Sequence, residues 1–289
     1  MPAAGAEPTY HGGVARRIGI IAGGGRLPLY TARGIRALGL EVACVGLSDQ
    51  YDQRLPQICD RFAAAGIIRI GRWIRLLRRW QVAETVMVGT VRKTKIYAPL
   101  RLVRQMPDWR AAKLWYRVLR YDHRNDALLG ALADELQRGG ITLIDTTRYI
   151  PDHMADEGAM TRKAPSAAQM ADIECALPVI RQLGELDIGQ SIAVREREII
   201  AVEAIEGTDA MIRRAGQLCP SGRWTLLKVA KPRQDKRFDV PTVGIDTIEN
   251  LKAHGAVCLA VEAGNVILLD KPEMIEAANR AGIVVIGVR

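Results

Sequence analysis

The hydrophobic positions of the first fifty residues follow the pattern of a strand, a helix and a second strand. The stretch "RIGIIA" at 17–22 is a short apolar run next to glycine, which is typical of a strand covered on both faces of a parallel sheet. Three glycines follow, then apolar residues at helical spacing up to about residue 38, then the apolar run "LEVACVGL" at 40–47. This order predicts a β-turn-α-β unit.

The same alternation of strand and helix patterns continues to the end of the chain. Further strands are expected at 85–89, 141–144, 190–195, 198–205, 225–230, 256–261, 265–269 and in the final "IVVIGV". Helices are expected at 125–138, 169–183, 209–217, 246–253 and 272–280. Periodicity is lost between 145 and 168, where turn residues collect. We therefore predict two α/β domains, 1–147 and 148–289, of which the first is an open Rossmann-like sheet.

The composition, 48% hydrophobic and 25% charged, is that of an ordinary globular protein. The five cysteines are odd in number and form no C-x-x-C pair, so neither a zinc ribbon nor a disulfide framework is indicated, and a reducing cytoplasm is expected. Cys44 and Cys258 lie in apolar runs and are expected to pack as small hydrophobic residues. The apolar run after Arg17 is too short for a signal peptide or a membrane span, so we expect neither export nor an integral membrane protein.

Positive charge is concentrated in one region of the chain. The net charge is +9, and residues 66–120 carry fourteen Arg and Lys against two acidic residues, a local balance of +12. Within this region, "RWIRLLRRW" at 72–80 places four apolar residues on one helical face: Trp73, Ile74, Leu77 and Trp80. Such a helix either lies on an anionic bilayer or packs on its own sheet. No helix-turn-helix, zinc-finger or RRM signature accompanies the charge, so no nucleic-acid partner is expected.

The glycines that follow the first strand admit two interpretations. Gly23, Gly24 and Gly25 stand between a strand and a helix, where backbone N–H groups and the helix dipole can hold a phosphate. A tight turn that requires positive φ explains them equally well. Pro28 stands where a dinucleotide fingerprint requires glycine or alanine, which argues against a dinucleotide-dependent oxidoreductase.

Carboxylates occur at the expected ends of several strands and helices, and they suit a magnesium site. Asp122 and Asp126 form one group, Asp209 a second, and Asp235 and Asp239 a third. Hard oxygen ligands from separate loops, completed by substrate phosphates, are typical of Mg²⁺. For "EGTDAMI" at 206–212, helix capping by Thr208 or Asp209 is the competing explanation.

The stretch "KVAKPRQDKRFDVPTVG" at 228–244 carries both signs of charge at close spacing. Its cations are Lys228, Lys231, Arg233, Lys236 and Arg237, and its carboxylates are Asp235 and Asp239. Lysine and arginine neutralise phosphate oxygens, while a nearby carboxylate holds a metal or takes a proton from water. The combination suits a diphosphate ligand.

Four motifs together resemble one family. "GIIAGGGRLPL", "RNDALL", "EGTDAMI" and "LLKVAKPRQDKRFDVPTVG" resemble the LpxI-type UDP-2,3-diacylglucosamine pyrophosphatases of lipid A biosynthesis, with the likeness running from about Arg17 to Val288. The resemblance implies hydrolysis of a UDP-linked diacylated glucosamine lipid to UMP and 2,3-diacylglucosamine 1-phosphate, with the lipid nucleotide held in the cleft between two α/β domains. It also implies Mg²⁺, or Mn²⁺ in its place, and peripheral attachment to the cytoplasmic face of the inner membrane.

The resemblance places Asp235 at a position associated with catalysis in the family and matches Asp209 and Asp126 to other acidic motif positions. The other roles are expected from the charge and type of each residue. The catalytic residues are expected to be Asp235, Asp209 and Lys231, and the metal ligands Asp235, Asp239 and Asp209. The residues expected to bind substrate are Gly23, Gly24, Gly25, Arg26, Asp126, Thr208, Lys228 and Arg237. Monomer and homodimer both stay open. The alternative function is a non-catalytic nucleotide- or lipid-binding module, which would leave the clustered aspartates unexplained.

Overall fold

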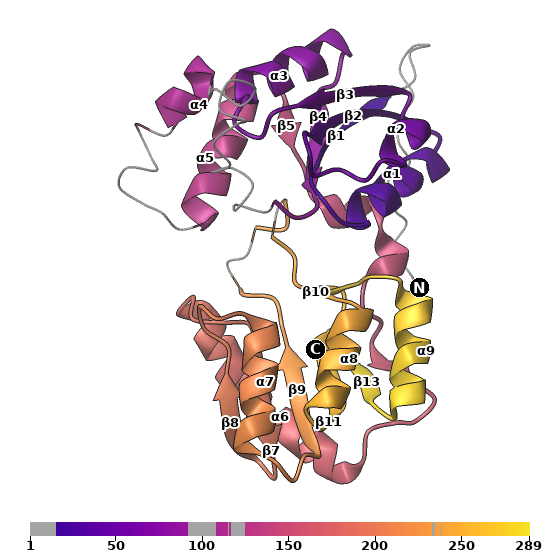
Figure 1. Cartoon of the computed structure of the whole chain (residues 1–289), viewed down its shortest axis with the longest axis vertical. Helices are drawn as coiled ribbons and strands as arrows, with labels where there is room; N and C mark the ends of the chain where they lie inside the picture. Colours follow the sequence, from indigo (N-terminus) through magenta and orange to yellow (C-terminus); the bar gives the residue numbers. More distant parts are fainter. Residues whose placement is uncertain (1–15, 92–107, 115, 117–124, 233–234, 238) are drawn as a thin grey trace, which may run out of the picture. The chain divides into compact units, whose positions relative to one another are not determined.

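The chain folds into two compact α/β units. The computed structural model describes residues 16–91, 108–114, 116, 125–232, 235–237 and 239–289, with the backbone alone for 125–127. Contacts divide the chain into Met1–Ile144 and Asp145–Arg289 (Figure 1). The sequence pattern placed the division between 147 and 148. Because each unit contains a sheet flanked by helices, the expected α/β class is confirmed.

The sheet of the N-terminal unit has the strand order of a Rossmann fold. In the described residues it is parallel throughout, in the order β3-β2-β1-β4-β5. Its strands are β1 (Arg17–Ala22), β2 (Glu41–Leu47), β3 (Arg61–Ala65), β4 (Glu84–Val88) and β5 (Thr142–Leu143). β1 and β2 are buried along almost their whole length, as their continuous apolar runs predict. The pattern missed β3, whose sequence "RFAAA" is short, rich in alanine and only partly buried.

Helices surround this sheet at the expected positions, with two short additions. They are α1 (Leu27–Ala37), α2 (Leu55–Ile58), α3 (Ile70–Arg79), α4 (Trp109–Leu114) and α5 (Asn125–Arg138). Pro28 lies in the first turn of α1, where its missing N–H costs nothing.

The amphipathic helix α3 packs on its own domain. Trp73, Ile74 and Leu77 are buried, and the Trp73 indole Nε1 donates a hydrogen bond to the Gly66 carbonyl oxygen at 2.9 Å. The apolar face is therefore used inside the N-terminal unit, and the interpretation of Trp73 as a membrane anchor is wrong. The basic residues that follow, from 92 to 104, lie outside the described residues.

The C-terminal unit contains a mixed sheet in the order β6-β13-β11-β9-β7-β8. Its strands are β6 (Gly158–Ala159), β7 (Ser191–Arg195), β8 (Glu198–Val202), β9 (Trp224–Lys228), β11 (Ala256–Glu262) and β13 (Val284–Val288). β9, β11 and β13 are parallel, and β7 is antiparallel to both β8 and β9. β8 therefore runs in the same direction as β9. A small parallel pair, β10 (Thr242–Val243) with β12 (Ile267–Leu268), lies outside this sheet.

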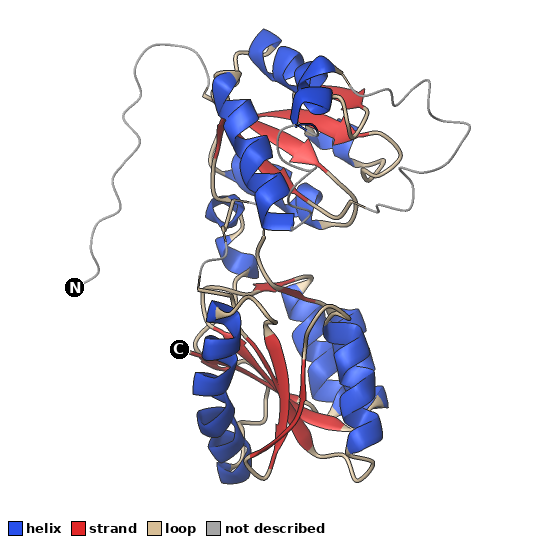
Figure 2. Ribbon diagram, turned by 90° about the vertical axis from the view of Figure 1, so that its left-hand side faces the viewer, coloured by secondary structure: helices blue, strands red, loops and turns tan. Residues whose placement is uncertain are grey.

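Helices cover both faces of this sheet (Figure 2). They are α6 (Ala167–Glu185), α7 (Thr208–Leu218), α8 (Ile245–Ala253) and α9 (Lys271–Ala281). α6 packs Ile173 and Ile180 on one face, in a cluster with Leu227. The other three helices contribute to a second cluster around Trp224 and Leu259. α6 begins two residues before the expected start, because Ser166 and Gln169 form a reciprocal capping box ahead of the apolar positions.

The cysteines are free thiols, and Cys44 and Cys258 are buried. Their packing as small hydrophobic residues is thus confirmed. Burial raises the pKa of Cys258 to about 12. Among the helices of the described chain, none combines the length and the apolar character that crossing a membrane requires.

Candidate active site

The carboxyl ends of β8, β9 and β11 and the amino end of β7 meet at one edge of the C-terminal sheet. Ser191, the first residue of β7, lies opposite Lys228, the last residue of β9, and Val261 lies opposite Lys228 from the other side. The Glu203 N–H, just beyond β8, donates to the Ser191 carbonyl oxygen at 2.9 Å. The carboxyl edge of parallel strands is where α/β sheets usually bind ligands. This edge, carrying the loops after β8, β9 and β11, is called the acidic edge below.

Lys228 is the buried centre of the acidic edge. Its side-chain Nζ donates to Thr208 Oγ1 at 2.9 Å, and Thr208 Oγ1 donates to Glu203 Oε1 at 3.0 Å. Burial lowers the pKa of Lys228, and the charges of Glu203, Asp209 and Asp239 oppose that shift. The charges of three carboxylates, Asp209 and Asp239 among them, thus act on one ammonium group.

The capping explanation for "EGTDAMI" does not hold. The N-cap of α7 is Gly207, with φ of 81°, and no side chain caps the helix. Thr208 instead directs its hydroxyl to Glu203 and Lys228. Asp209 lies in the first turn of α7, where the helix dipole favours a negative charge.

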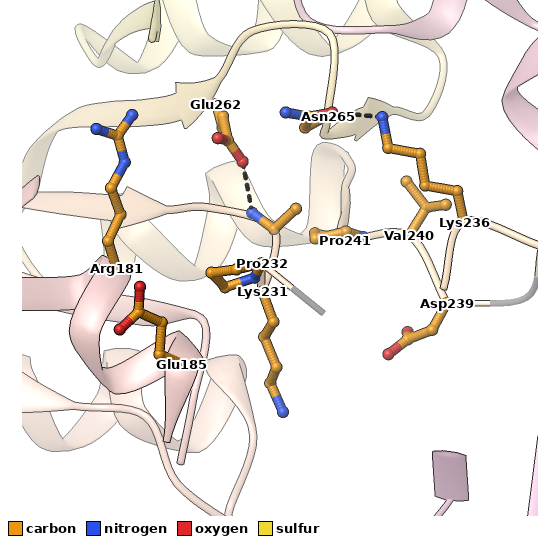
Figure 3. Close-up of a pocket in the computed structure, with 11 residues that line it drawn as sticks. Arg181, Glu185, Lys231, Pro232, Lys236, Asp239, Val240, Pro241, Glu262 and Asn265 are labelled. Carbon is orange, nitrogen blue, oxygen red and sulfur yellow. Dashed lines mark hydrogen bonds between the residues drawn. The ribbon is translucent and has the colours of Figure 1, made fainter. Parts of the chain in front are cut away.

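The loop after β9 is anchored at its start and folded back on itself. The Ala230 N–H donates to Glu262 Oε2 at 2.9 Å, which ties the loop to the end of β11 (Figure 3). The Asp239 N–H donates to the Asp235 carbonyl oxygen at 3.0 Å, closing a turn. These two bonds bring Asp239 back toward the acidic edge, which explains its effect on the pKa of Lys228.

The cations of this loop already have polar partners. Lys231 Nζ bonds Asp187 Oδ1 at 2.6 Å, and Lys236 Nζ bonds Asn265 Oδ1 at 2.7 Å. Both pairs are in contact with solvent, with the Lys231 side chain 25% and the Asp187 side chain 52% exposed, so exchanging their partners for phosphate oxygens would cost little.

Asp235 is held by Arg237. Its Oδ1 accepts from the Arg237 N–H at 3.0 Å and from Arg237 Nε at 2.9 Å, and its Oδ2 accepts from Arg237 Nη2 at 2.5 Å. The side-chain hydrogen bond from Arg237 holds the pKa of Asp235 below its ordinary value. The carboxylate is therefore ionised at neutral pH and pre-oriented. The close spacing of opposite charges in the sequence is explained in part by this pair between Asp235 and Arg237.

The three expected metal ligands have unequal surroundings. Asp209 and Asp239 both lie near Lys228, and among the described residues neither carboxylate accepts a hydrogen bond, whereas Asp235 faces Arg237. Within the part of the chain that is described, no three Asp, Glu, His or Cys side chains are gathered closely enough to hold a metal ion. The donor set available to a hard cation is thus two oxygen ligands, which leaves several coordination positions for water and phosphate.

A pocket of about 350 Å³ lies beside the loop and brings in residues that the sequence motifs did not indicate (Figure 3). Lys231, Lys236 and Asp239 line it. Four further lining residues, Arg181, Glu185, Glu262 and Asn265, come from α6, the end of β11 and the turn that follows it.

In the N-terminal unit, the glycine loop is packed tightly on the end of β4. The Gly23 N–H donates to the Val88 carbonyl oxygen at 2.8 Å, and the Gly24 N–H donates to the Thr90 carbonyl oxygen at 2.8 Å. Both N–H groups are thus engaged within the fold. Only Gly25 has positive φ, 86°, with open space around it. Arg26 follows at the N-cap of α1. Close packing is therefore the structural reason for the first two glycines, and a left-handed turn for the third.

Replacing Gly23 by alanine is expected to destabilise the N-terminal unit by about 2 kcal/mol or more. The new Cβ would lie 2.7 Å from the Thr90 carbonyl oxygen and 2.9 Å from the Gly89 carbonyl carbon, both backbone atoms. Gly130→Ala is the control, because it lies inside α5 with nothing within 4 Å and should stabilise by about 1 kcal/mol. Urea unfolding measures both changes. Equal stability of Gly23→Ala and wild type would contradict the close packing.

The last expected site residue, Asp126, is in α5, which begins at Asn125 as the sequence pattern predicted. Its side chain lies outside what the structure describes, as do Asp122 and Arg233.

Comparison with known proteins agrees with the order of the motifs. A family model described as the LpxI N-terminal domain matches residues 17–153, and one described as the LpxI C-terminal domain matches residues 156–286. The UDP-2,3-diacylglucosamine pyrophosphatase LpxI of Caulobacter vibrioides is 34% identical over 283 residues, covering 94% of this chain and 98% of that protein.

Among solved structures, a nucleoside-diphosphate-sugar epimerase from Pseudomonas aeruginosa matches 57% of this chain and 69% of its own, at 16% identity and a TM-score of 0.27. Because the two domain models match in order along nearly the whole sequence and the Caulobacter protein aligns from end to end, the chain belongs to the LpxI family.

Proposed function

We propose that this protein hydrolyses the diphosphate of UDP-2,3-diacylglucosamine, releasing UMP and 2,3-diacylglucosamine 1-phosphate. The observation that carries the proposal is the acidic edge, where the loop "KPRQDKRFD" and the residues Thr208 and Asp209 of "EGTDAMI" meet at Lys228. The name of the Caulobacter relative, with which this chain shares 34% identity, supplies the substrate.

The charge balance of the acidic edge supports a divalent cation as cofactor. The described residues there include four cations, Lys228, Lys231, Lys236 and Arg237, and six carboxylates, Asp187, Glu203, Asp209, Asp235, Asp239 and Glu262. Arg181 and Glu185 add one charge of each sign. Carboxylates outnumber cations even when Arg233 is counted, so a diphosphate would meet net negative charge unless a metal binds with it.

Mg²⁺ fits these donors, with Mn²⁺ as the alternative. Asp209 and Asp239 would hold it, with Asp235 as a third ligand if its pair with Arg237 opens. When bound, the metal supplies charge neutralisation at the diphosphate oxygens as the anhydride bond breaks.

The protein's own residues would do the rest of the chemistry. Hydrolysis forms one P–O bond to water and breaks one P–O bond of the anhydride, so the water must be oriented and must lose a proton. Asp235, ionised and held in place by Arg237, is suited to orient this water. Lys231 and Arg237 would neutralise phosphate oxygens.

Because the proposed substrate carries acyl chains, we expect the reaction to take place at a membrane. A peripheral position on the cytoplasmic face of the inner membrane is part of the proposal. Three apolar side chains near the acidic edge, Leu186, Ile188 and Ile205, have exposed fractions of 70%, 45% and 104%. They are better suited to contact lipid than the buried face of α3.

The deciding experiment is incubation of the purified protein with UDP-2,3-diacylglucosamine and Mg²⁺, followed by chromatography for UMP. We expect UMP and 2,3-diacylglucosamine 1-phosphate in equal amounts. UDP-glucose serves as the control substrate, since it has the diphosphate without acyl chains. Binding of the lipid nucleotide without any UMP would contradict the proposal and favour a non-catalytic binding module.

A further inference from the structure

Glu203, which no motif in the sequence indicated, is joined by hydrogen bonds through Thr208 to Lys228, two residues that the motifs did indicate. Lys228 has an exposed fraction of 6% and Glu203 of 7%, so both charges are largely removed from water. Thr208 Oγ1 lies between them, 2.9 Å from Lys228 Nζ and 3.0 Å from Glu203 Oε1. Ser191 Oγ lies 3.3 Å from the same hydroxyl.

The chemistry of the three groups fixes which of them donates and which accepts each hydrogen bond. An ammonium group donates and cannot accept, and an ionised carboxylate accepts and cannot donate. The single hydroxyl hydrogen of Thr208 therefore goes to Glu203, and its oxygen receives a hydrogen from Lys228. Both bonds involve a charged group, which makes them stronger than neutral ones.

These hydrogen bonds also explain how a flexible lysine side chain stays in one place. A lysine side chain has four rotatable carbon–carbon bonds, and its ammonium group prefers water. Here the neighbouring carboxylates Asp209 and Asp239 act on the same ammonium, and they come from separate loops. Among the described residues, Glu203 Oε2 has no hydrogen-bond partner, so this carboxylate bonds to Thr208 through Oε1 alone.

We propose that Glu203 and Thr208 are positioning residues, which hold the Lys228 ammonium group in one place at the acidic edge, beside the site of diphosphate cleavage. The inference rests on the proposed function for its kinetic consequences. Its structural part, the fixed position of Lys228, stands on the hydrogen bonds alone.

Thr208→Val and Glu203→Gln test these hydrogen bonds. Each substitution removes one hydrogen-bonding or charged group while keeping the shape of the side chain. Both are expected to lower kcat for UMP release by about tenfold to a hundredfold, with KM changed by less than about threefold. Thr208→Ser keeps the hydroxyl and should restore kcat to within about threefold of wild type. Thr85→Val is the matched control, since Thr85 is fully buried in β4 and its hydroxyl has no partner in the described part of the chain.

A second readout reports the position of Lys228 without turnover. Acylation of lysines by an amine reagent, followed by peptide mass spectrometry, should show Lys228 protected in the wild type and at least about tenfold more reactive in Thr208→Val, because the released side chain can reach water. Wild-type kcat in Thr208→Val, a Thr208→Ser variant as impaired as Thr208→Val, or an equal loss in Thr85→Val would each overturn the inference. If the wild type releases no UMP, the proposed function fails, and the labelling then decides the position of Lys228.

Discussion

Asp235→Ala is expected to lower UMP release by about a thousandfold, while the melting temperature stays close to that of the wild type. The substitution removes the carboxylate proposed to orient water, and it leaves Arg237 without its bidentate partner. Asp235→Asn separates the two effects, because the amide oxygen can still accept the Arg237 N–H while the charge is lost. We expect Asp235→Asn to be nearly as impaired as Asp235→Ala. Steady-state kinetics and thermal unfolding of the same preparations give the two measurements.

A second aspartate–arginine pair in the protein provides a control for this experiment. Asp52 and Arg54, in the N-terminal unit, form the same arrangement: the Arg54 N–H donates to Asp52 Oδ1 at 2.9 Å, and Arg54 Nη2 donates to Asp52 Oδ2 at 2.7 Å. The Arg54 side-chain hydrogen bond lowers the pKa of Asp52 to about 2. Asp52→Ala should therefore cost the fold as much as Asp235→Ala while retaining at least about a third of the activity. An Asp235→Ala variant as active as Asp52→Ala would remove Asp235 from the catalytic residues.

Removal of divalent cations is expected to abolish UMP release, with full recovery when Mg²⁺ is added in excess of the chelator. The physical reason is the charge balance of the acidic edge, where the described carboxylates named above outnumber the cations. Two of those cations are paired with carboxylates, Lys231 with Asp187 and Arg237 with Asp235. A diphosphate therefore depends on an added cation for neutralisation. Activity measured against free Mg²⁺ concentration, after treatment with EDTA, tests this.

The same titration identifies the ligands. Asp239→Asn should raise the Mg²⁺ concentration needed for half-maximal activity by about tenfold or more, because it removes a hard anionic ligand. Asp187→Asn is the control: this carboxylate also belongs to the edge, but it pairs with Lys231 and should leave the Mg²⁺ requirement unchanged. Full activity in EDTA, or equal shifts in both variants, would count against a metal bound at Asp239.

Much of the architecture followed from local sequence pattern. The continuous apolar runs of β1 and β2 predicted a covered parallel sheet, and the order β3-β2-β1-β4-β5 confirms it. The pattern failed at β3, because "RFAAA" at a partly exposed edge carries little hydrophobic signal. For α3, periodicity identified the apolar face correctly but not what it packs against, which turned out to be its own domain.

The sequence motifs indicated only part of the candidate site. The motifs pointed to Thr208, Asp209, Lys228 and Asp239, and the structure brings these four together. Glu203, Ser191 and Glu262 were missed, since a single acid or serine at a strand end has no distinctive spacing. Conversely, the three glycines suggested a phosphate loop, yet two of their N–H groups are bonded to the end of β4.

The sequence by itself determined the α/β class, the alternation of strands and helices, and the motifs that mark the family, because apolar periodicity and turn residues are local properties of the chain. Only the tertiary structure decided which charges meet. Strand direction and register place Ser191 and Glu203 beside Lys228 and Glu262 beside Ala230, and loop folding brings Lys231 to Asp187. These pairings depend largely on contacts between residues far apart in the chain, for which no short stretch of sequence carries the information.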